Sequence, residues 1–244
     1  MSIIDDWLFE YGKLHFSLID PDSQHPKEAG IKAKKCADFG TNAIMVGGTT
    51  VQSRQQVYKT VERIKAATDC PVILFPNSKS FLVENADYLF FMSLLNSTNT
   101  LHRFIEQLEG APYVKQLGIT PIPTGYMVIS TSPTPTTVET KTQLDKIGIN
   151  DIEKAIKYAL YAEYTGMRVL YMDAGSHPYQ PISNTMVKKV KEKLSVPLII
   201  GGGIRSAKIA REKVQAGADI IVTGTAVEEN TAIVESIITA IKES

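Results

Sequence analysis

The sequence predicts a single (β/α)8 barrel over residues 1–244, in which eight parallel strands alternate with helices. Short apolar runs alternate with amphipathic stretches along the whole chain, which is the pattern of successive βα units. The length of 244 residues suits one such barrel, because these folds usually take about 250 residues. Glycine-rich turns after the last two runs, at 201–203 and 224–225, are typical of the phosphate-binding end of a barrel.

Eight apolar runs are expected to form the strands of this TIM barrel. Most are β-branched and stop at a proline, a glycine or a polar residue, as buried parallel strands do. The fifth run is less regular, because Pro121, Pro123 and Gly125 interrupt its first half. We therefore expect strands at residues 14–19, 43–46, 72–75, 88–95, 126–129, 168–172, 198–200 and 220–222.

Helices are expected between these runs, and several have recognisable ends. Ser183 and Ser206 are placed to cap two of them, and Asn150 with Glu153 matches a capping box. The third helix, near residues 80–86, is expected to be short or irregular. The helix after the fourth strand carries an apolar stripe at positions i, i+3, i+4 and i+7, made of Leu101, Phe104, Ile105 and Leu108.

Residues 131–149 are rich in threonine and proline and show no apolar periodicity. Two interpretations are open. The segment is either a long surface loop at the barrel mouth, which acts as a lid where it is ordered, or a tolerated flexible insertion.

Composition excludes several classes of function. Lys plus Arg and Asp plus Glu are equal, at 26 each, so charge gives no reason to expect a nucleic-acid partner or an anionic membrane. The N-terminus is acidic and lacks the regions of a signal peptide, and residues 88–95, the most apolar run, are too short to span a bilayer. Cys36 and Cys70 lack metal-site spacing. We expect a cytoplasmic protein with no transmembrane segment.

Polar and glycine residues follow six of the expected strands. The carboxyl ends of barrel strands face one end of the fold, where active sites of such barrels lie. Burying Asp173 without a partner is costly, which favours a functional role, and Asp20 has the same position on the first strand. The residues at these ends are Asp20, Thr49, Asn96, Asp173, Ser176, the 201–203 turn and Gly224-Thr225.

Simpler interpretations of the same residues stay open. Asp20 precedes a proline and is able to cap a turn, and Arg205 is either a phosphate neighbour or a surface charge. Tyr126 suits core packing and substrate contact equally. The strand ends hold no Ser-His or Cys-His pair of the acyl-transfer kind, and the chain has neither a Rossmann fingerprint nor a P-loop.

Five motifs, in order along nearly the whole chain, have a specific combined pattern. They are Leu-Ile-Asp-Pro-Asp at 18–22, Val-Gly-Gly-Thr at 46–49, Tyr-Met-Asp-Ala-Gly-Ser at 171–176, Ile-Gly-Gly-Gly-Ile-Arg at 200–205 and Val-Thr-Gly-Thr at 222–225. In this combination the chain resembles the geranylgeranylglyceryl phosphate synthases and the related PcrB prenyltransferases.

The resemblance implies a set of site residues. Asp20 and Thr49 would bind Mg²⁺, and Asp173 would be catalytic, orienting or deprotonating a substrate hydroxyl. Two departures stand out, because the family usually has glutamate at position 173 and glycine at 177. Leu18 replaces a phosphate-binding lysine of one branch, which indicates the other branch. The implied sn-glycerol 1-phosphate site comprises Tyr171, Met172, Asp173, Ala174, Gly175, Ser176, His177, Gly202, Gly203, Gly224 and Thr225.

The activity that the resemblance implies is that of a phosphoglycerol geranylgeranyltransferase. This enzyme joins the 3-hydroxyl of sn-glycerol 1-phosphate to geranylgeranyl diphosphate through an ether and releases diphosphate, the first ether-linking step of archaeal-type membrane lipid biosynthesis. A homo-oligomer is expected. Three alternatives stay open: a prenyltransferase of the same family with another chain length, a phosphosugar isomerase or epimerase, and a barrel that only binds a phosphorylated ligand. An isomerase would need a second acid or a base across the barrel, which the third and fifth strand ends do not supply.

Overall fold

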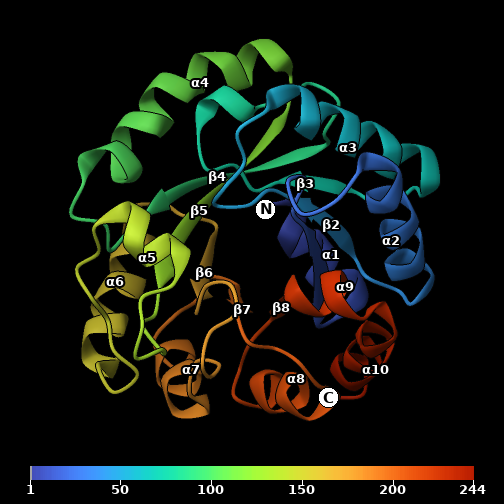
Figure 1. The fold of residues 1–244 in the computed structure, drawn as a ribbon. Coiled ribbons are helices and arrows are strands. Elements are labelled where there is room, and N and C mark those ends of the chain that lie inside the picture. Colours follow the sequence, from blue (N-terminus) through green and yellow to red (C-terminus); the bar gives the residue numbers. More distant parts are fainter. Residues whose placement is uncertain (1) are drawn as a thin grey trace.

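Eight parallel strands close into a barrel in sequence order in the computed structural model, which describes residues 2–244 (Figure 1). Apart from β4 and β5, the strands are short and almost wholly buried, because helices cover their outer faces and neighbouring strands satisfy their backbones. The predicted TIM barrel is confirmed. Its strands are β1 (Leu14–Ile19), β2 (Ala43–Val46), β3 (Val72–Leu74), β4 (Tyr88–Leu94), β5 (Thr120–Val128), β6 (Val169–Asp173), β7 (Leu198–Gly201) and β8 (Ile220–Thr223).

Helices surround the barrel as an outer layer (Figure 1). Ser183 and Ser206 cap their helices as predicted, accepting hydrogen bonds from the backbone N–H groups of Met186 and Ile209. The helices are α1 (Ile3–Tyr11), α2 (Pro26–Asp38), α3 (Arg54–Ala67), α4 (Glu106–Leu117), α5 (Thr137–Thr142), α6 (Ile152–Tyr164), α7 (Asn184–Lys191), α8 (Ala207–Gln215), α9 (Thr225–Glu229) and α10 (Thr231–Lys242), with a 3-10 turn η1 (Lys79–Phe81) and a π-helical stretch η2 (Leu101–Ile105). Among residues 2–244, no helix combines the length and apolar character needed to cross a bilayer.

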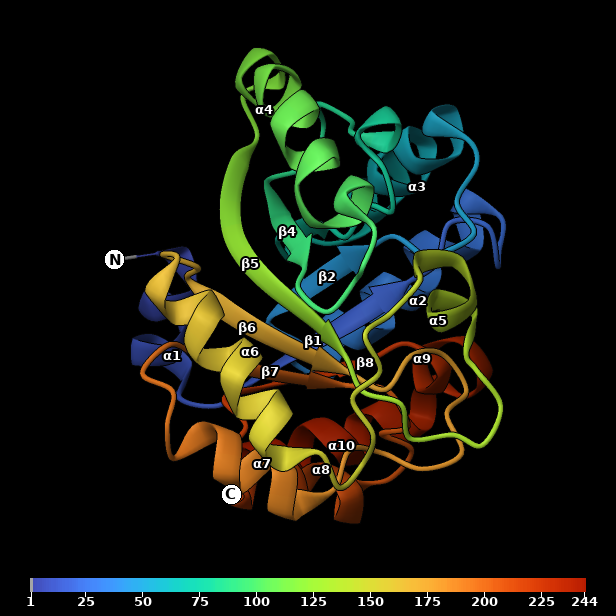
Figure 2. The ribbon, with the colours of Figure 1, turned by 90° about the vertical axis from the view of Figure 1, so that its left-hand side faces the viewer.

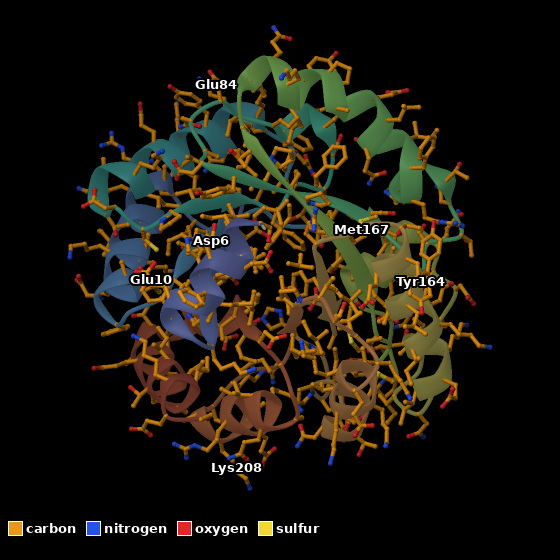
Figure 3. All side chains as sticks on the ribbon, turned by 180° about the vertical axis from the view of Figure 1, so that it is seen from behind. Asp6, Glu10, Glu84, Tyr164, Met167 and Lys208 are labelled. Atoms are coloured by element: carbon orange, nitrogen blue, oxygen red, sulfur yellow. The ribbon has the colours of Figure 1, made fainter. Side chains whose placement is uncertain are left out.

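The α1 helix closes the amino-terminal end of the barrel. Trp7 packs edge-on against Phe16 and Tyr88, with ring centroids 6.0 and 5.4 Å apart. Figure 2 shows the strands pointing away from α1, with α5 and α9 at the opposite end. Figure 3 shows α1, which carries Asp6 and Glu10, lying across the closed end. The carboxyl ends of the strands are therefore the end available for a site.

The third βα unit is short, as the sequence predicts. A single 3-10 turn, η1, follows β3 where the other units have a helix. Glu106 at the start of α4 accepts hydrogen bonds from the Lys79 N–H (2.8 Å) and the Ser78 hydroxyl (3.2 Å). Lys79 also forms an ion pair with Glu109. These contacts tie α4 to η1, and the space left by the missing helix becomes part of the site.

The apolar stripe of residues 101–108 faces a different direction from the one its periodicity predicts. Leu101, Phe104 and Leu108 are 40%, 58% and 56% exposed, whereas Gly110 and Val114 are buried. The π-helical turn shifts the register between the first five residues and α4. The inner face of this segment instead carries polar side chains, notably Glu106, which bonds to the η1 turn.

The fifth strand is longer than the 126–129 run expected from the sequence. It begins at Thr120 and pairs with β4 along its whole length up to Tyr126, whereas pairing with β6 begins only at Thr124. The Thr120 N–H points toward β4. Because backbone groups alternate in direction along a strand, the nitrogens of Pro121 and Pro123 point to the other side, where β6 has not yet begun. Neither proline removes a ladder hydrogen bond, and the strand tolerates both.

The capping box predicted at Asn150 is not formed. The helix α6 begins one residue later, with Asp151 at the N-cap, and the Asp151 carboxylate accepts a hydrogen bond from the Gly148 N–H at 2.8 Å. Asp151 is therefore used to close the preceding turn. A pattern of residue types alone does not distinguish these two uses of a short polar side chain.

Residues 131–149 fold over the barrel mouth and contact the rest of the barrel. The segment contains α5, which starts with a capping box between Thr136 and Glu139. The Ser97 hydroxyl donates to the Thr142 carbonyl at 2.7 Å, and Ile147 is fully buried. Figure 2 shows α5 at the carboxyl end of the strands, so the segment contributes directly to the site.

The closed end gives a stability prediction that is separate from the site. Trp7→Ala should lower the free energy of unfolding by about 3–5 kcal/mol, because it empties a buried aromatic contact. Phe9→Ala on the same helix is the matched control, since Phe9 is 94% exposed and Trp7 only 9%. Denaturant unfolding measures both. Equal stability of the two variants would contradict the role assigned to α1, and turnover per folded molecule should be unchanged in each.

Candidate active site

Two cavities open at the carboxyl ends of the strands. The smaller, about 50 Å³, lies where β6, β7 and β8 end, and the glycine turns 201–203 and 224–225 form much of its wall. Most of the predicted substrate residues meet there. Those that line it are Tyr171, Asp173, Gly175, Ser176, Gly202, Gly203, Gly224 and Thr225.

The two glycine turns serve the small cavity in different ways. Gly202 has φ +80°, and a Cβ there would lie 2.7 Å from the Ala174 nitrogen, so the fold itself requires glycine. A Cβ at Gly224 would meet only the Leu18 side chain, which itself lines the cavity, with Cδ2 nearest at 3.3 Å. Gly224 thus keeps the cavity open without being essential to the chain's path.

Three predicted substrate residues do not line the small cavity. Met172 is fully buried in the layer between strands and helices, because side chains alternate along β6 and its neighbours Tyr171 and Asp173 point inward. Ala174 is buried beneath Gly202. The exposed side chain of His177 lies 3.4 Å from Glu229, and its φ of 50° matches the glycine-like conformation expected where the family has glycine.

Asp173 is nine-tenths buried and held at both oxygens. The Tyr126 hydroxyl donates to Oδ2 at 2.7 Å, and the Gly175 N–H donates to Oδ1 at 2.9 Å. Burial raises the pKa of the Asp173 carboxyl above its usual value, while these two hydrogen bonds act in the opposite direction. Burial and the nearby Asp173 charge also raise the pKa of Tyr126, so its hydroxyl stays protonated and remains a donor.

The larger cavity, about 440 Å³, lies between β3, β4, η1 and α4. Its wall is mostly apolar and aromatic, and the short third unit provides the room. Tyr126 and residues of that unit line it. The apolar lining consists of Phe75, Phe81, Leu82, Leu89, Phe90, Phe91, Met92, Leu94, Val114, Tyr126 and Val138.

The two cavities meet at the Tyr126–Asp173 hydrogen bond. Tyr126 lines the large cavity and Asp173 the small one. The rings of Phe75 and Tyr171 hold Tyr126 in place, with centroids 5.5 and 5.3 Å from its own. An apolar compartment and a polar compartment are therefore in contact across a single carboxylate.

Asp20 and Thr49 lie at the ends of β1 and β2. The Asp20 carboxylate sits directly over Gly48, since a Cβ there would be 2.0 Å from Oδ2. Burial raises the pKa of Asp20 to about 6, and the charges of Glu228 and Asp22 act in the same direction. Thr49 lines the large cavity, and its carbonyl accepts hydrogen bonds from Asn77 at 3.1 Å and from Lys141 at 3.2 Å.

Asp20 alone does not make a protein-only metal cage. Among residues 2–244, no group of three or more His, Cys, Asp or Glu side chains is placed to hold a metal ion. Magnesium commonly uses one or two carboxylates together with water and substrate phosphates. Asp20 lines neither cavity itself, but its single carboxylate lies against Gly48 in the wall of the large one, and this arrangement fits that pattern.

Several residues at this end were not assigned to the site from the sequence. Leu18 and Val222 line the small cavity, and Lys79, His102 and Glu106 line the large one. Strand alternation would have found the first two, because Phe16 pairs with Val222 and Leu18 is two residues further along the same face. The other three depend on how α4 packs against η1, which no local pattern encodes.

Two other polar residues have clear positions. Asn96 is fully buried and its amide exchanges hydrogen bonds with the Val128 backbone, at 2.9 and 3.1 Å, so it holds β4 and β5 together rather than facing substrate. Arg205 lines the small cavity, and its guanidinium donates to the Pro178 carbonyl at 3.4 Å. The side chain is also exposed to solvent.

The chain is similar to known proteins over nearly its whole length. A model of the PcrB family matches residues 5–244. Geranylgeranylglyceryl phosphate synthase of Pyrococcus abyssi is 45% identical over 224 residues, which cover 92% of this chain and 88% of that protein. The synthase of Methanopyrus kandleri is 41% identical over 237 residues, covering 97% and 98% of the two chains.

A solved structure is similar over its entire length. The crystal structure of (S)-3-O-geranylgeranylglyceryl phosphate synthase from Thermoplasma acidophilum, in complex with its substrate sn-glycerol-1-phosphate, matches with a TM-score of 0.95. The two sequences are 36% identical and the match covers 100% of each chain. Because the family model and these relatives match nearly all of the chain, the protein belongs to the PcrB family.

Proposed function

We propose that this chain is a phosphoglycerol geranylgeranyltransferase, which joins sn-glycerol 1-phosphate to geranylgeranyl diphosphate. The observation that carries the proposal is the contact between a polar, glycine-walled cavity and a larger apolar one across the Tyr126–Asp173 hydrogen bond. The reaction needs such a pair of compartments, because one substrate is a small phosphate ester and the other carries a long hydrocarbon tail. Relatives similar over nearly the whole chain are named for this product.

The small cavity suits the glycerol phosphate. Backbone N–H groups of glycine turns are the groups that barrels of this type direct at a phosphate. Ser176 and Thr225 add hydroxyls to the same wall. The phosphate held there would leave the 3-hydroxyl free to extend toward Asp173, in line with the near-attack arrangement that bimolecular transfer requires.

The large cavity suits the prenyl tail. Its aromatic and aliphatic residues would shield the allylic carbon from water as that carbon gains positive charge. Phosphosugar isomerases and epimerases act on substrates without a hydrocarbon tail, so an apolar cavity of about 440 Å³ favours prenyl transfer over that alternative. Other prenyl lengths within the same reaction class are distinguished by the assay below.

We propose that Asp20, with Thr49 beside it, holds Mg²⁺ together with the donor diphosphate. Bound there, Mg²⁺ would supply charge neutralisation for the departing diphosphate. Asp20 contributes an ionised carboxylate, and Gly48 leaves room for it to approach the chain closely. The negative charges of Asp22 and Glu228 make this position favourable for a cation.

Asp173 is proposed to accept or direct the proton of the 3-hydroxyl. A carboxylate oxygen accepts more than one hydrogen bond, so the bonds from Tyr126 and Gly175 leave capacity for the substrate. Burial raises the pKa of Asp173, which makes the ionised form a stronger base than an exposed aspartate. Tyr126 and Gly175 fix its orientation.

The reaction itself is tested with purified protein, sn-glycerol 1-phosphate and labelled prenyl diphosphates of several lengths, with and without Mg²⁺. We expect an ether product and free diphosphate, most efficiently with the geranylgeranyl donor and only with the metal. Turnover of a sugar phosphate without a prenyl donor would favour the isomerase alternative. We also propose that the enzyme is a cytoplasmic homo-oligomer, and light scattering of the purified protein measures its mass.

Asp173→Asn separates catalysis from structure. The asparagine keeps both hydrogen bonds, because its carbonyl accepts from Gly175 and its amide donates to the Tyr126 hydroxyl, so the melting temperature should change little. If Asp173 is the base, kcat should fall by about 10²–10⁴-fold while the KM for glycerol phosphate changes much less. A stable variant with normal turnover would show that Asp173 only anchors the 174–177 turn.

Gly224→Ala tests the small cavity. The added methyl meets only the flexible Leu18 side chain and no backbone atom, so the protein should stay folded. The KM for sn-glycerol 1-phosphate should rise, and the KM for the prenyl donor should not. Gly202→Ala gives the contrast, because its Cβ collides with the Ala174 backbone and the melting temperature should fall. If Gly224→Ala raised only the KM for the prenyl donor, the assignment of the two substrates to the two cavities would have to be reversed.

Asp20→Asn tests the metal site. In the wild type, Mg²⁺ affinity measured by calorimetry should fall as the pH drops through about 6, because the metal binds the ionised carboxylate. The variant should bind Mg²⁺ weakly at every pH and lose most activity. Metal affinity equal to the wild type would contradict the assignment.

The stability of that variant has a defined sign. The folded-state pKa of Asp20 lies above the unfolded value, so ionising this group costs stability as the pH rises toward and through about 6. Asp20→Asn removes that cost. Its melting temperature at neutral pH should therefore equal or exceed that of the wild type, which separates loss of activity from loss of fold.

A further inference from the structure

Lys141 brings a positive charge from the 131–149 segment to the mouth of the large cavity. It lies in α5, and its Nζ donates a hydrogen bond to the Thr49 carbonyl at 3.2 Å. Thr49 follows Gly48, over which the Asp20 carboxylate sits. The Lys141 ammonium and the Asp20 carboxylate therefore both contact the short turn after β2, at one edge of the cavity.

The charge of Lys141 is not paired with a carboxylate. Among residues 2–244, the ion pairs within 4.0 Å do not include it. Lys79 also lines the large cavity, but Glu109 neutralises it. Lys141 is thus the lysine of the cavity wall whose charge is still available for a ligand.

The backbone that carries Lys141 is anchored on both sides. Before it, Glu139 accepts hydrogen bonds from the Thr136 N–H and hydroxyl, each at 2.8 Å, and from Ser130. After it, the Thr142 carbonyl accepts from the Ser97 hydroxyl at 2.7 Å. The side chain itself is exposed and held only by one carbonyl, so it is free to turn to a better acceptor without moving the helix.

The groups around Asp20 create a need for such a cation. The carboxylate charges of Glu228 and Asp22 both act on Asp20, so this corner of the site is already negative. A diphosphate next to three carboxylates would be repelled unless positive charge offsets it. One divalent ion balances only part of that charge, and Lys141 approaches from the α5 side.

We propose that Lys141 binds the diphosphate of the prenyl donor and stabilises it as it leaves, an inference that rests on the proposed function. The bond between the allylic carbon and the diphosphate oxygen breaks, and its electron pair goes to the diphosphate. The ether bond forms from the 3-oxygen of glycerol phosphate, whose proton passes to Asp173. The three N–H donors of the ammonium partner the oxygens that gain charge.

The test compares Lys141→Met with Lys146→Met. Methionine keeps an unbranched stem and removes the charge, and Lys146 is an exposed lysine of the same segment that does not line either cavity. With Mg²⁺ present, titration of inorganic diphosphate should show about tenfold or greater loss of affinity for Lys141→Met and little change for Lys146→Met. Lys141→Arg should recover part of the affinity.

Steady-state kinetics give a second, independent readout. For Lys141→Met, kcat/KM for geranylgeranyl diphosphate should fall about tenfold or more, while the KM for sn-glycerol 1-phosphate and the melting temperature stay as in the wild type. Equal behaviour of the Lys141 and Lys146 variants would overturn the inference, as would a loss shared by both substrates. If the wild type itself transfers no prenyl group, the proposed function fails instead, and the two failures are therefore distinguishable.

Discussion

The hydrogen bond between Tyr126 and Asp173 is the contact on which the rest of the site depends. It joins residues of neighbouring strands whose side chains line different cavities, and it sets the direction of the Asp173 carboxylate in the wall of the small one. Burial makes the charge of Asp173 costly, so its hydrogen bonds from Tyr126 and Gly175 must be maintained for the ionised form to persist. The aromatic cluster around Tyr126 supplies that constraint.

The large cavity exists because the third βα unit lacks a full helix. The third βα unit has one 3-10 turn, and α4 is tied to that turn by Glu106 and Lys79 rather than packed on a helix. The barrel thus keeps its closed strands while one outer position becomes apolar binding space. At the opposite end, Trp7 packs across the barrel interior. The barrel is therefore closed at the amino ends of its strands and open at their carboxyl ends.

The sequence predicted the barrel, the short third unit and the glycine turns, because each depends on local chemistry that a single chain displays. It failed where the outcome depends on neighbours. Pro121 and Pro123 are tolerated because β6 starts later than β5, and the 101–108 stripe faces outward because of a π-helical turn. Met172 was assigned from a motif, although alternation next to Asp173 turns its side chain into the outer core. Lys141 belongs to no recognisable motif, and it reaches the cavity mouth only because of where α5 folds.

The most direct measurement of the central claim is a crystal structure of this chain with sn-glycerol 1-phosphate and a thiodiphosphate analogue of geranylgeranyl diphosphate that does not react. The account predicts the phosphate at the 201–203 and 224–225 turns, the tail in the apolar cavity, and the 3-hydroxyl and the allylic carbon meeting beside Asp173 and Tyr126. A tail bound outside the large cavity, or a hydroxyl directed away from Asp173, would contradict it.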